Sequence, residues 1–370
     1  MLHVLSRGLL PAMRASRRDL IVLLLVGAFS LATEACATRS VDEPGHAALG
    51  GPARLLDASP RTVAREVETE ISVDGGEPDG SEWSPAPPRL LELGLRIDKV
   101  HKASRLSWRQ VQTLNWQAVA DGLPSLPRER PLSSGKCPKG MVEIHGSLLL
   151  DAKGKLDTDG VLDLQDSACE SWGVPRRICE RFSEQKWKAL AATLPRKAFR
   201  FCVDRYEYPN RHGEFPLVVT TFSESSKYCE KEGKRLCTES EWTLACEGEE
   251  GRPYPYGYAR DATACPIDRP RVEPPEDTFV PRTTGHTARG IDTMWSGERS
   301  GAFARCVSPF GVSDMTGNVD EWTRSDRSWG YKMILKGGHW SYVRGRCRPQ
   351  TRGHGPLYVN AETGFRCCRD

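Results

Sequence analysis

Two carboxylates lie on either side of a glycine-containing turn within residues 311–322 of this chain. Asp314 precedes Gly317, and Glu321 follows it. Such a turn brings side-chain and backbone oxygens together, and calcium takes about six to eight oxygen ligands in a flexible geometry. The segment is therefore a candidate calcium site. The alternative interpretation is a capped turn that buries Trp322 in the core.

Cysteine and histidine are the other residues here that commonly bind metals or act as nucleophiles. The chain has 13 cysteines and 8 histidines but no C-x-x-C, H-x-H or H-x-x-x-H spacing. Zinc sites and thioredoxin-type redox pairs therefore have little support. We interpret His286, His339 and His354 as loop histidines that are hydrogen-bonded or solvated. Hydrolase and nucleotide-binding motifs are also absent from the sequence.

Thirteen cysteines are too many for an ordinary cytosolic enzyme, and the N-terminus has the features of an export signal. Arginines between residues 14 and 18 precede the apolar run 20–29, which is too short to span a bilayer. Two interpretations of the next residues remain open: peptidase cleavage within 35–37, or lipidation of Cys36. We expect an extracytoplasmic protein of the periplasm or cell envelope, and an outer-membrane lipoprotein in the second case.

Composition divides the chain into four parts. Residues 1–37 form the signal peptide, of either type. Residues 38–88 are rich in Pro, Gly, Asp, Glu and Ser, which predicts a disordered tether. Residues 89–136 are ambiguous, although 108–119 has helical spacing. The packed domain is expected over 137–370.

Local patterns predict a few elements within this domain. Strands are expected at 141–144 and 202–207, where apolar residues alternate with polar ones. A helix is expected over 223–232, beginning at a serine cap. Another is expected over 238–246, where Thr238 and the glutamate three residues later have capping-box spacing.

Four sequence segments carry a family resemblance. Residues 233–242, 311–322, 336–340 and 364–368 closely resemble, in the same order, the sulfatase-modifying-factor family, whose named member is the formylglycine-generating enzyme. The resemblance implies a C-type-lectin-like α+β fold that is loop-rich, with little regular secondary structure. With so many cysteines, we expect this domain to be stapled by disulfides.

The resemblance also assigns ligands to the carboxylate turn. It implies a calcium ion held by the side chains of Asp314 and Glu321 and by the backbone carbonyls of Gly317 and Val319. Calcium is therefore the cofactor that we expect, and copper is not expected.

Two disulfides follow from the same resemblance. It pairs Cys229 with Cys367 and Cys246 with Cys347. Cys137 with Cys202 and Cys169 with Cys179 are plausible further pairs, but sequence does not fix the remaining connectivity.

Catalysis by the resembled enzyme needs two thiolates to hold copper(I), because soft sulfur ligands select that ion. The corresponding segment here, 337–347, contains a single cysteine. An ungapped count places Tyr342 at the first thiolate position and Cys347 at the second. A count from the C-terminal Gly-Phe-Arg sequence, which we prefer, places Cys347 in a disulfide. By either count, the segment lacks the pair of thiolates that the reaction needs.

The sequence therefore favours an exported, non-catalytic binding or scaffold module without formylglycine-generating activity. The alternative is a metal-dependent oxidoreductase of the same family, with Cys347 as a catalytic residue beside Cys306 or His339. Its substrate would be an envelope protein or a small molecule.

The partner is expected to be an unidentified envelope ligand or protein. The net charge of +3 is too small to indicate a nucleic-acid partner. The last 40 residues are basic, which suits either an anionic ligand or, as we favour, a solvated face with one or two arginines in buried pairs.

Overall fold

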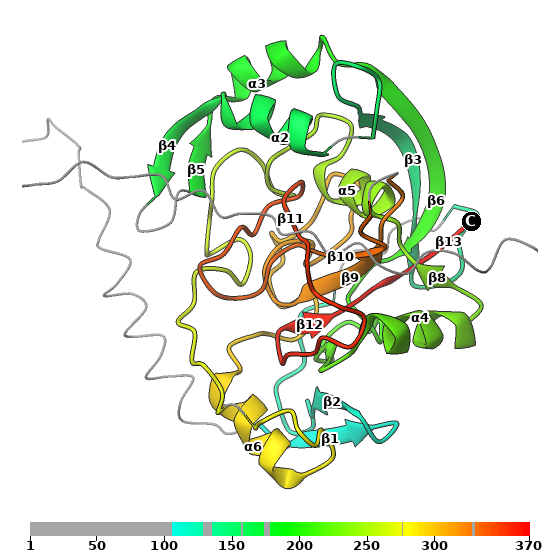
Figure 1. The fold of residues 1–370 in the computed structure, drawn as a ribbon, viewed down its shortest axis with the longest axis vertical. Helices are drawn as coiled ribbons and strands as arrows, with labels where there is room; N and C mark the ends of the chain where they lie inside the picture. Colours follow the sequence, from blue (N-terminus) through cyan, green and yellow to red (C-terminus); the bar gives the residue numbers. More distant parts are fainter. Residues whose placement is uncertain (1–105, 129–134, 157, 174–177, 276, 328–329) are drawn as a thin grey trace, which may run out of the picture. The chain divides into compact units, whose positions relative to one another are not determined.

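The structure is a computed structural model that describes residues 106–128, 135–156, 158–173, 178–275, 277–327 and 330–370 (Figure 1). The expected signal peptide and tether lie outside the described residues. All described residues belong to one unit of the chain, Glu82–Asp370. Within the described part of the chain, no helix is both long and apolar enough to cross a membrane.

The longest strands form an antiparallel pair that the C-terminus extends. β3 (Met141–Leu149) pairs along its whole length with β6 (Arg196–Asp204). On its other side, β6 pairs with β13 (Cys367–Arg369). The strand predicted at 141–144 is therefore present and longer. Of the strand predicted at 202–207, only 202–204 belong to β6, and 205–207 lie beyond its end.

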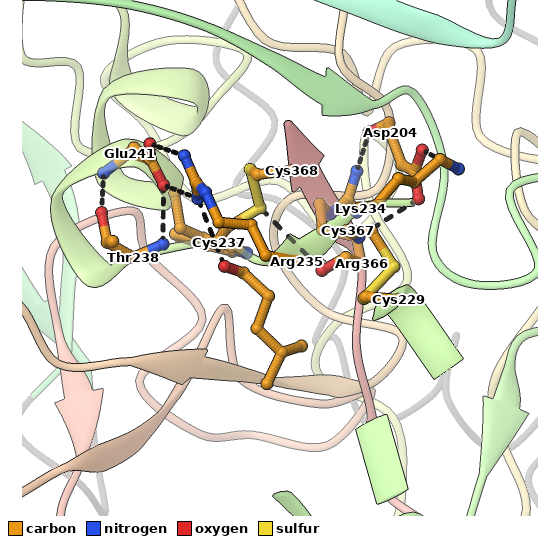
Figure 2. Close-up of a disulfide and its surroundings, with 12 residues drawn as sticks. Asp204, Cys229, Lys234, Arg235, Cys237, Thr238, Glu241, Arg366, Cys367 and Cys368 are labelled. Carbon is orange, nitrogen blue, oxygen red and sulfur yellow. Dashed lines mark hydrogen bonds and ion pairs between the residues drawn. A yellow bond between two sulfur atoms is a disulfide. The ribbon is translucent and has the colours of Figure 1, made fainter. Parts of the chain in front are cut away.

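Two disulfides fasten the C-terminal strand to neighbouring elements. β13 also pairs with β8 (Arg235–Leu236), which gives the sheet order β3-β6-β13-β8. Figure 2 shows Cys368 bonded to Cys237 and Cys367 bonded to Cys229. These bonds join residues 131 and 138 positions apart. In the chain-entropy description, each closes a loop long enough to destabilise the unfolded chain by about 5 kcal/mol.

A second sheet consists of four short strands. In order they are β11 (Gln350–Thr351), β10 (Met333–Lys336), β9 (Asp320–Arg324) and β12 (Thr363–Gly364). β12 runs parallel to β9, and the other pairs are antiparallel. Trp322 projects from β9 into the core and is 1 % exposed, as the capped-turn interpretation expects.

Two helices begin with capping boxes. α4 (Phe222–Lys231) is capped by Thr221, whose hydroxyl accepts from the backbone N–H of Glu224. The predicted serine cap is therefore wrong, because the helix includes Phe222 at its first position, where that ring packs against Trp322. α5 (Glu239–Glu247) begins after Thr238, and its predicted capping box is confirmed.

The segment with helical spacing at 108–119 is a β-hairpin, so the helical interpretation is wrong. β1 (Trp108–Val111) pairs with β2 (Asn115–Ala118), and β2 pairs with β7 (Leu217–Val218). Residues 112 and 113 have positive φ angles of 47° and 70°, which turn the chain between the strands. Pairing with β7 outweighs the local spacing, because it buries the apolar side chains and satisfies the backbone.

The remaining elements are short and are joined by long loops. They are α2 (Thr158–Asp166), β4 (Cys169–Gly173), β5 (Ile178–Phe182), α3 (Glu184–Ala191) and α6 (Gly285–Met294). The described residues thus form a loop-rich α+β fold stapled by six disulfides. This is the fold class that the sequence predicts.

Candidate functional site

The chain turns sharply at Gly337 and Gly338, directly after β10. Both residues have positive φ, at 92° and 74°. A Cβ on Gly338 would lie 2.9 Å from the backbone nitrogen of Gly345. Only glycine meets both conditions without strain. The segment 339–347 therefore folds back beside its own start, and this is the segment in which the resemblance locates the enzyme's thiolates.

Cys347, the one cysteine of this segment, is bonded to Cys246 on α5. Both residues are fully buried. Tyr342 packs its ring against the guanidinium of Arg260, which lies 5.2 Å from the ring centroid. The segment consequently presents neither of the two thiolates that a copper(I) site requires.

Every cysteine in the described part of the chain is paired. Cys229–Cys367 and Cys246–Cys347, which the resemblance implies, are both present. The other pairs are Cys137–Cys202, Cys169–Cys179, Cys237–Cys368 and Cys265–Cys306. Cys36 lies outside the described residues, so its lipidation stays a prediction.

His339 and Ser341 lie beside the carboxylate of Glu362. Nδ1 of His339 is 3.4 Å from Glu362 Oε1 and 3.2 Å from Ser341 Oγ. A Ser–His–acid relay uses the two different nitrogens of the imidazole ring, whereas both partners here contact Nδ1. Arg271 donates to both oxygens of Glu362, at 2.7 and 3.1 Å. This cluster lacks the arrangement of a hydrolase triad.

The metal arrangement of the alternative oxidoreductase is not assembled either. Cys306 is bonded to Cys265, so neither it nor Cys347 is a free thiolate. Among the described residues, no three His, Cys, Asp or Glu side chains converge in a metal-binding arrangement. The structure therefore does not provide the metal ligands that catalysis by Cys347, beside Cys306 or His339, would need.

The carboxylate turn is occupied by a buried ion pair. Glu321 accepts from Arg366 through both oxygens, at 2.7 Å each, and from the indole N–H of Trp242 at 2.8 Å. Asp314 accepts from the backbone N–H of Gly301 at 2.7 Å. The guanidinium of Arg366 also approaches the backbone oxygen of Asp314, at 3.5 Å. Arg366 thus links the two residues that the resemblance assigns as side-chain ligands of calcium.

A third carboxylate, Glu207, adds negative charge to this region. Its Oε2 accepts from Asn318 at 2.7 Å and from Ser300 at 3.2 Å, while the buried Oε1 has no hydrogen-bond partner. Burial raises the pKa of Glu207, and the charges of Asp314 and Glu321 raise it further. The buried Oε1 of Glu207 is an oxygen of the kind that a hard cation such as calcium prefers, but Arg366 already occupies both oxygens of Glu321.

The sequence did not identify Glu207 or the role of Arg366. Arg366 lies in the Gly-Phe-Arg sequence of the family resemblance. The resemblance identified this segment, but it did not show that Arg366 pairs with the buried Glu321. Glu207 follows β6 in a stretch with no distinguishing spacing. Its proximity to Asp314 depends on tertiary structure alone.

The predicted buried arginine pairs are present, and more of the basic C-terminal residues turn inward than predicted, while Lys332 and Arg369 stay exposed. Four of the basic residues are at most 6 % exposed: Lys336, Arg346, Arg348 and Arg366. Arg346 binds Asp166 at 2.7 Å, and Arg348 binds Glu247 at 2.6 Å. Arg348 and Arg366 lie inside with the buried carboxylates of Glu247 and Glu321, which require a cation.

Known proteins resemble part of the chain. An inactive C-alpha-formylglycine-generating enzyme 2 from Bos taurus is 30 % identical over 166 residues, which cover 42 % of this chain and 50 % of that protein. A serine/threonine-protein kinase pkn1 from Chlamydia caviae is 26 % identical over 179 residues, covering 43 % of this chain and 24 % of the kinase. The chain spans half or less of these relatives' lengths.

Among solved structures, that of CarF is 14 % identical and has a TM-score of 0.38, covering 63 % of this chain and 98 % of CarF. The family described as "Sulfatase-modifying factor enzyme 1-like domain" matches residues 184–370, half of the chain. This range contains all four segments of the resemblance. This chain belongs to the sulfatase-modifying-factor family and has its C-type-lectin-like α+β fold.

Proposed function

We propose that this protein is a non-catalytic binding or scaffold module that acts outside the cytoplasm. The observation that carries the proposal is the Cys246–Cys347 disulfide. Formylglycine generation needs two thiolates in the segment 337–347, and the single sulfur of that segment is held in this bond. Two relatives, from Bos taurus and Mus musculus, are named as inactive formylglycine-generating enzymes, which agrees with the proposal.

An oxidising location is part of the proposal. Six disulfides form and persist outside the cytoplasm and are rare inside it. We infer the periplasm or cell envelope, with an N-terminal signal or a lipid at Cys36 as the route. The partner is then an envelope ligand or an envelope protein.

Calcium is the cation that we propose for the carboxylate turn. Asp314, Glu321 and the carbonyls of Gly317 and Val319 would hold it, near the unpartnered oxygen of Glu207. The ion would stabilise the fold by binding these oxygens in the folded state. We expect EGTA to lower the melting temperature of the intact protein and calcium to restore it. Asp314→Asn should abolish the difference, and an unchanged melting temperature would contradict the proposal.

A thiol and metal inventory tests the non-catalytic function directly. The full chain, produced in an oxidising compartment, is denatured for a thiol count, and the native sample is taken for elemental analysis. We expect no free thiol and no stoichiometric copper or iron. Two free thiols that include Cys347, together with stoichiometric copper or iron, would make the protein an oxidoreductase.

A further inference from the structure

A solvent-open cavity of about 510 Å³ lies between the segments 252–261 and 305–309. Its lining includes Arg252, Tyr256, Tyr258, Asp261, Arg305 and Pro309. The volume lies in the range of small-molecule sites, about 300–1,000 Å³. None of these residues belongs to the carboxylate turn or to the segment 337–347, although Arg260, which lies between two lining residues, donates to Val343 O of that segment at 3.0 Å.

The two walls of the cavity are fixed in place. The Cys265–Cys306 disulfide cross-links the segment that follows Asp261 to the wall that contains Arg305. Tyr256 stacks on the buried Tyr254, with ring centroids 5.5 Å apart and planes 11° from parallel. A site held in this way loses little conformational entropy when a ligand binds.

Arginine side chains stand on both walls with their orientations set by neighbours. One terminal nitrogen of Arg305 lies 3.0 Å from Asp261 Oδ2, and the other donates to Thr263. Arg252 donates through Nε to Glu250 at 2.8 Å, which leaves its two terminal nitrogens available to a ligand. A guanidinium presents a planar fork of donors that matches a carboxylate.

Tyrosine rings provide the apolar part of the lining. Tyr256 lies in the tight turn 254–257, Tyr258 follows that turn, and both side chains line the cavity. An aromatic face packs well against the C–H face of a sugar ring, while arginines and a carboxylate bind its acidic and hydroxyl groups. The lining carries two arginines and one aspartate. Because Glu250 takes only Nε of Arg252, the terminal nitrogens of Arg252 are the donors that remain for an anionic ligand.

We propose that this cavity binds a carboxylate-bearing sugar unit of an envelope glycan. The inference rests on the proposed binding function and assigns its site and ligand class. An extended peptide is less suited, because peptides commonly add a strand at an open sheet edge. Here the backbone of 258–260 already pairs with β5: Phe182 donates to Tyr258 O at 2.9 Å, and Arg260 donates to Glu180 O at 2.6 Å.

Titration calorimetry of the full chain with oligogalacturonate tests the proposal. The neutral galactose oligomer of equal length and a proline-containing peptide with a free C-terminus serve as competing probes. Arg305→Gln and Tyr258→Ala are the test variants. Arg211→Gln is the matched control, because Arg211 is similarly exposed and also contacts a surface carboxylate, that of Glu214.

We expect saturable binding of oligogalacturonate that weakens at least tenfold in Arg305→Gln and in Tyr258→Ala but not in Arg211→Gln. Equal binding of the neutral oligomer would overturn the acidic specificity, and preferential binding of the peptide would overturn the ligand class. If a sample without free thiols binds none of the probes, the proposed binding site is wrong, but the proposed non-catalytic function is not contradicted. Free Cys347 thiol with bound copper in that sample would overturn the proposed function instead.

Discussion

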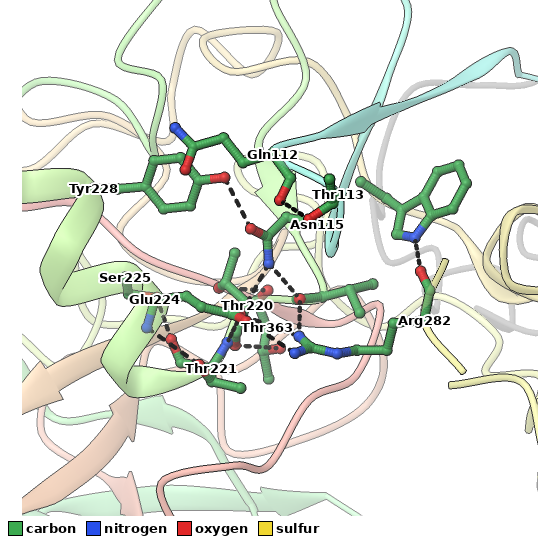
Figure 3. A network of polar contacts seen from close by, with 12 residues as sticks. Gln112, Thr113, Asn115, Thr220, Thr221, Glu224, Ser225, Tyr228, Arg282 and Thr363 are labelled. Atoms are coloured by element: carbon green, nitrogen blue, oxygen red, sulfur yellow. Dashed lines mark hydrogen bonds and ion pairs between the residues drawn. The ribbon is translucent and has the colours of Figure 1, made fainter. Parts of the chain in front are cut away.

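Two glutamate–arginine pairs in this molecule have similar geometry but different surroundings. Arg366 binds both oxygens of Glu321 at 2.7 Å, and the two side chains are 0 % and 1 % exposed. Arg282 binds both oxygens of Glu224 at 2.8 and 3.0 Å, and these side chains are 17 % and 20 % exposed (Figure 3). Burial is the main difference between them.

The comparison shows that the same contact has different consequences at different depths. If one partner of the inner pair is lost, the remaining charge is left in the core without water, which costs far more than the pair contributes. Near the surface, water replaces a lost partner, and the net contribution of such a pair is small. The outer pair has an additional role, because Glu224 also caps α4 and accepts from Asn115 of the hairpin.

Arg366→Met should produce the largest effect. The substitution leaves Glu321 buried without its cation and removes donors to the backbone oxygens of Ser313 and Asp204. We expect the free energy of unfolding to fall by about 3–5 kcal/mol, measured by denaturant titration with the disulfides intact. A loss below about 1 kcal/mol would show that the buried pair behaves like a surface pair and would remove the contrast.

Much of this arrangement could be predicted from the sequence, and the rest depends on distant contacts. Spacing alone gave the capping box at Thr238, because a cap is a local interaction over three residues. The hairpin at 108–118 could not be read locally, since its stabilising partner, β7, lies about a hundred residues further on. Glu207 and Arg366 meet the carboxylate turn for the same non-local reason.

Lys336 sharpens the comparison, because it is a buried cation without a carboxylate bonded to it in the described structure. Its Nζ donates to the backbone oxygen of Arg348 at 2.7 Å and lies 5.3 Å from the ring centroid of Trp242. Burial, assisted by the charges of Arg327 and Arg348 and opposed by that of Glu239, lowers the pKa of Lys336 from 10.5 to about 7.

The unfolded chain therefore binds a proton at Lys336 between pH 7 and 10.5 that the folded protein has released, so stability should rise with pH in this window. Lys336→Met should remove that rise, by up to about 1.4 kcal/mol per pH unit. The measurement is the difference in unfolding free energy between pH 7 and pH 9 for each protein. Lys188→Met, an exposed lysine, is the control. Parallel pH dependences in Lys336→Met and the unmodified protein would contradict the lowered pKa.

Arg282→Met tests the outer pair. It removes the bonds to Glu224 and the one to the backbone oxygen of Val219. We expect a loss of about 1 kcal/mol, measured under the same conditions as for Arg366→Met. Asn115 still donates to Glu224 at 3.0 Å in this variant, so the hairpin should remain attached. A loss equal to that of Arg366→Met would mean that the outer pair is effectively buried.

The smallest effect concerns the acid response of the outer pair. Burial raises the pKa of Glu224, but the bonds from Arg282, the Thr221 backbone and Asn115 outweigh it and bring the pKa to about 2. Since the ordinary value is 4.5, the stabilisation is fully present above pH 4.5 and is lost as the pH falls from 4.5 to 2. Glu224→Gln should therefore flatten this part of the stability profile by less than about 1 kcal/mol, because solvent screens a partly exposed pair. The measurement is the fall in unfolding free energy between pH 5 and pH 3, in Glu224→Gln and in the unmodified protein. If the variant loses as much stability as the unmodified protein, the acid response comes from other carboxylates.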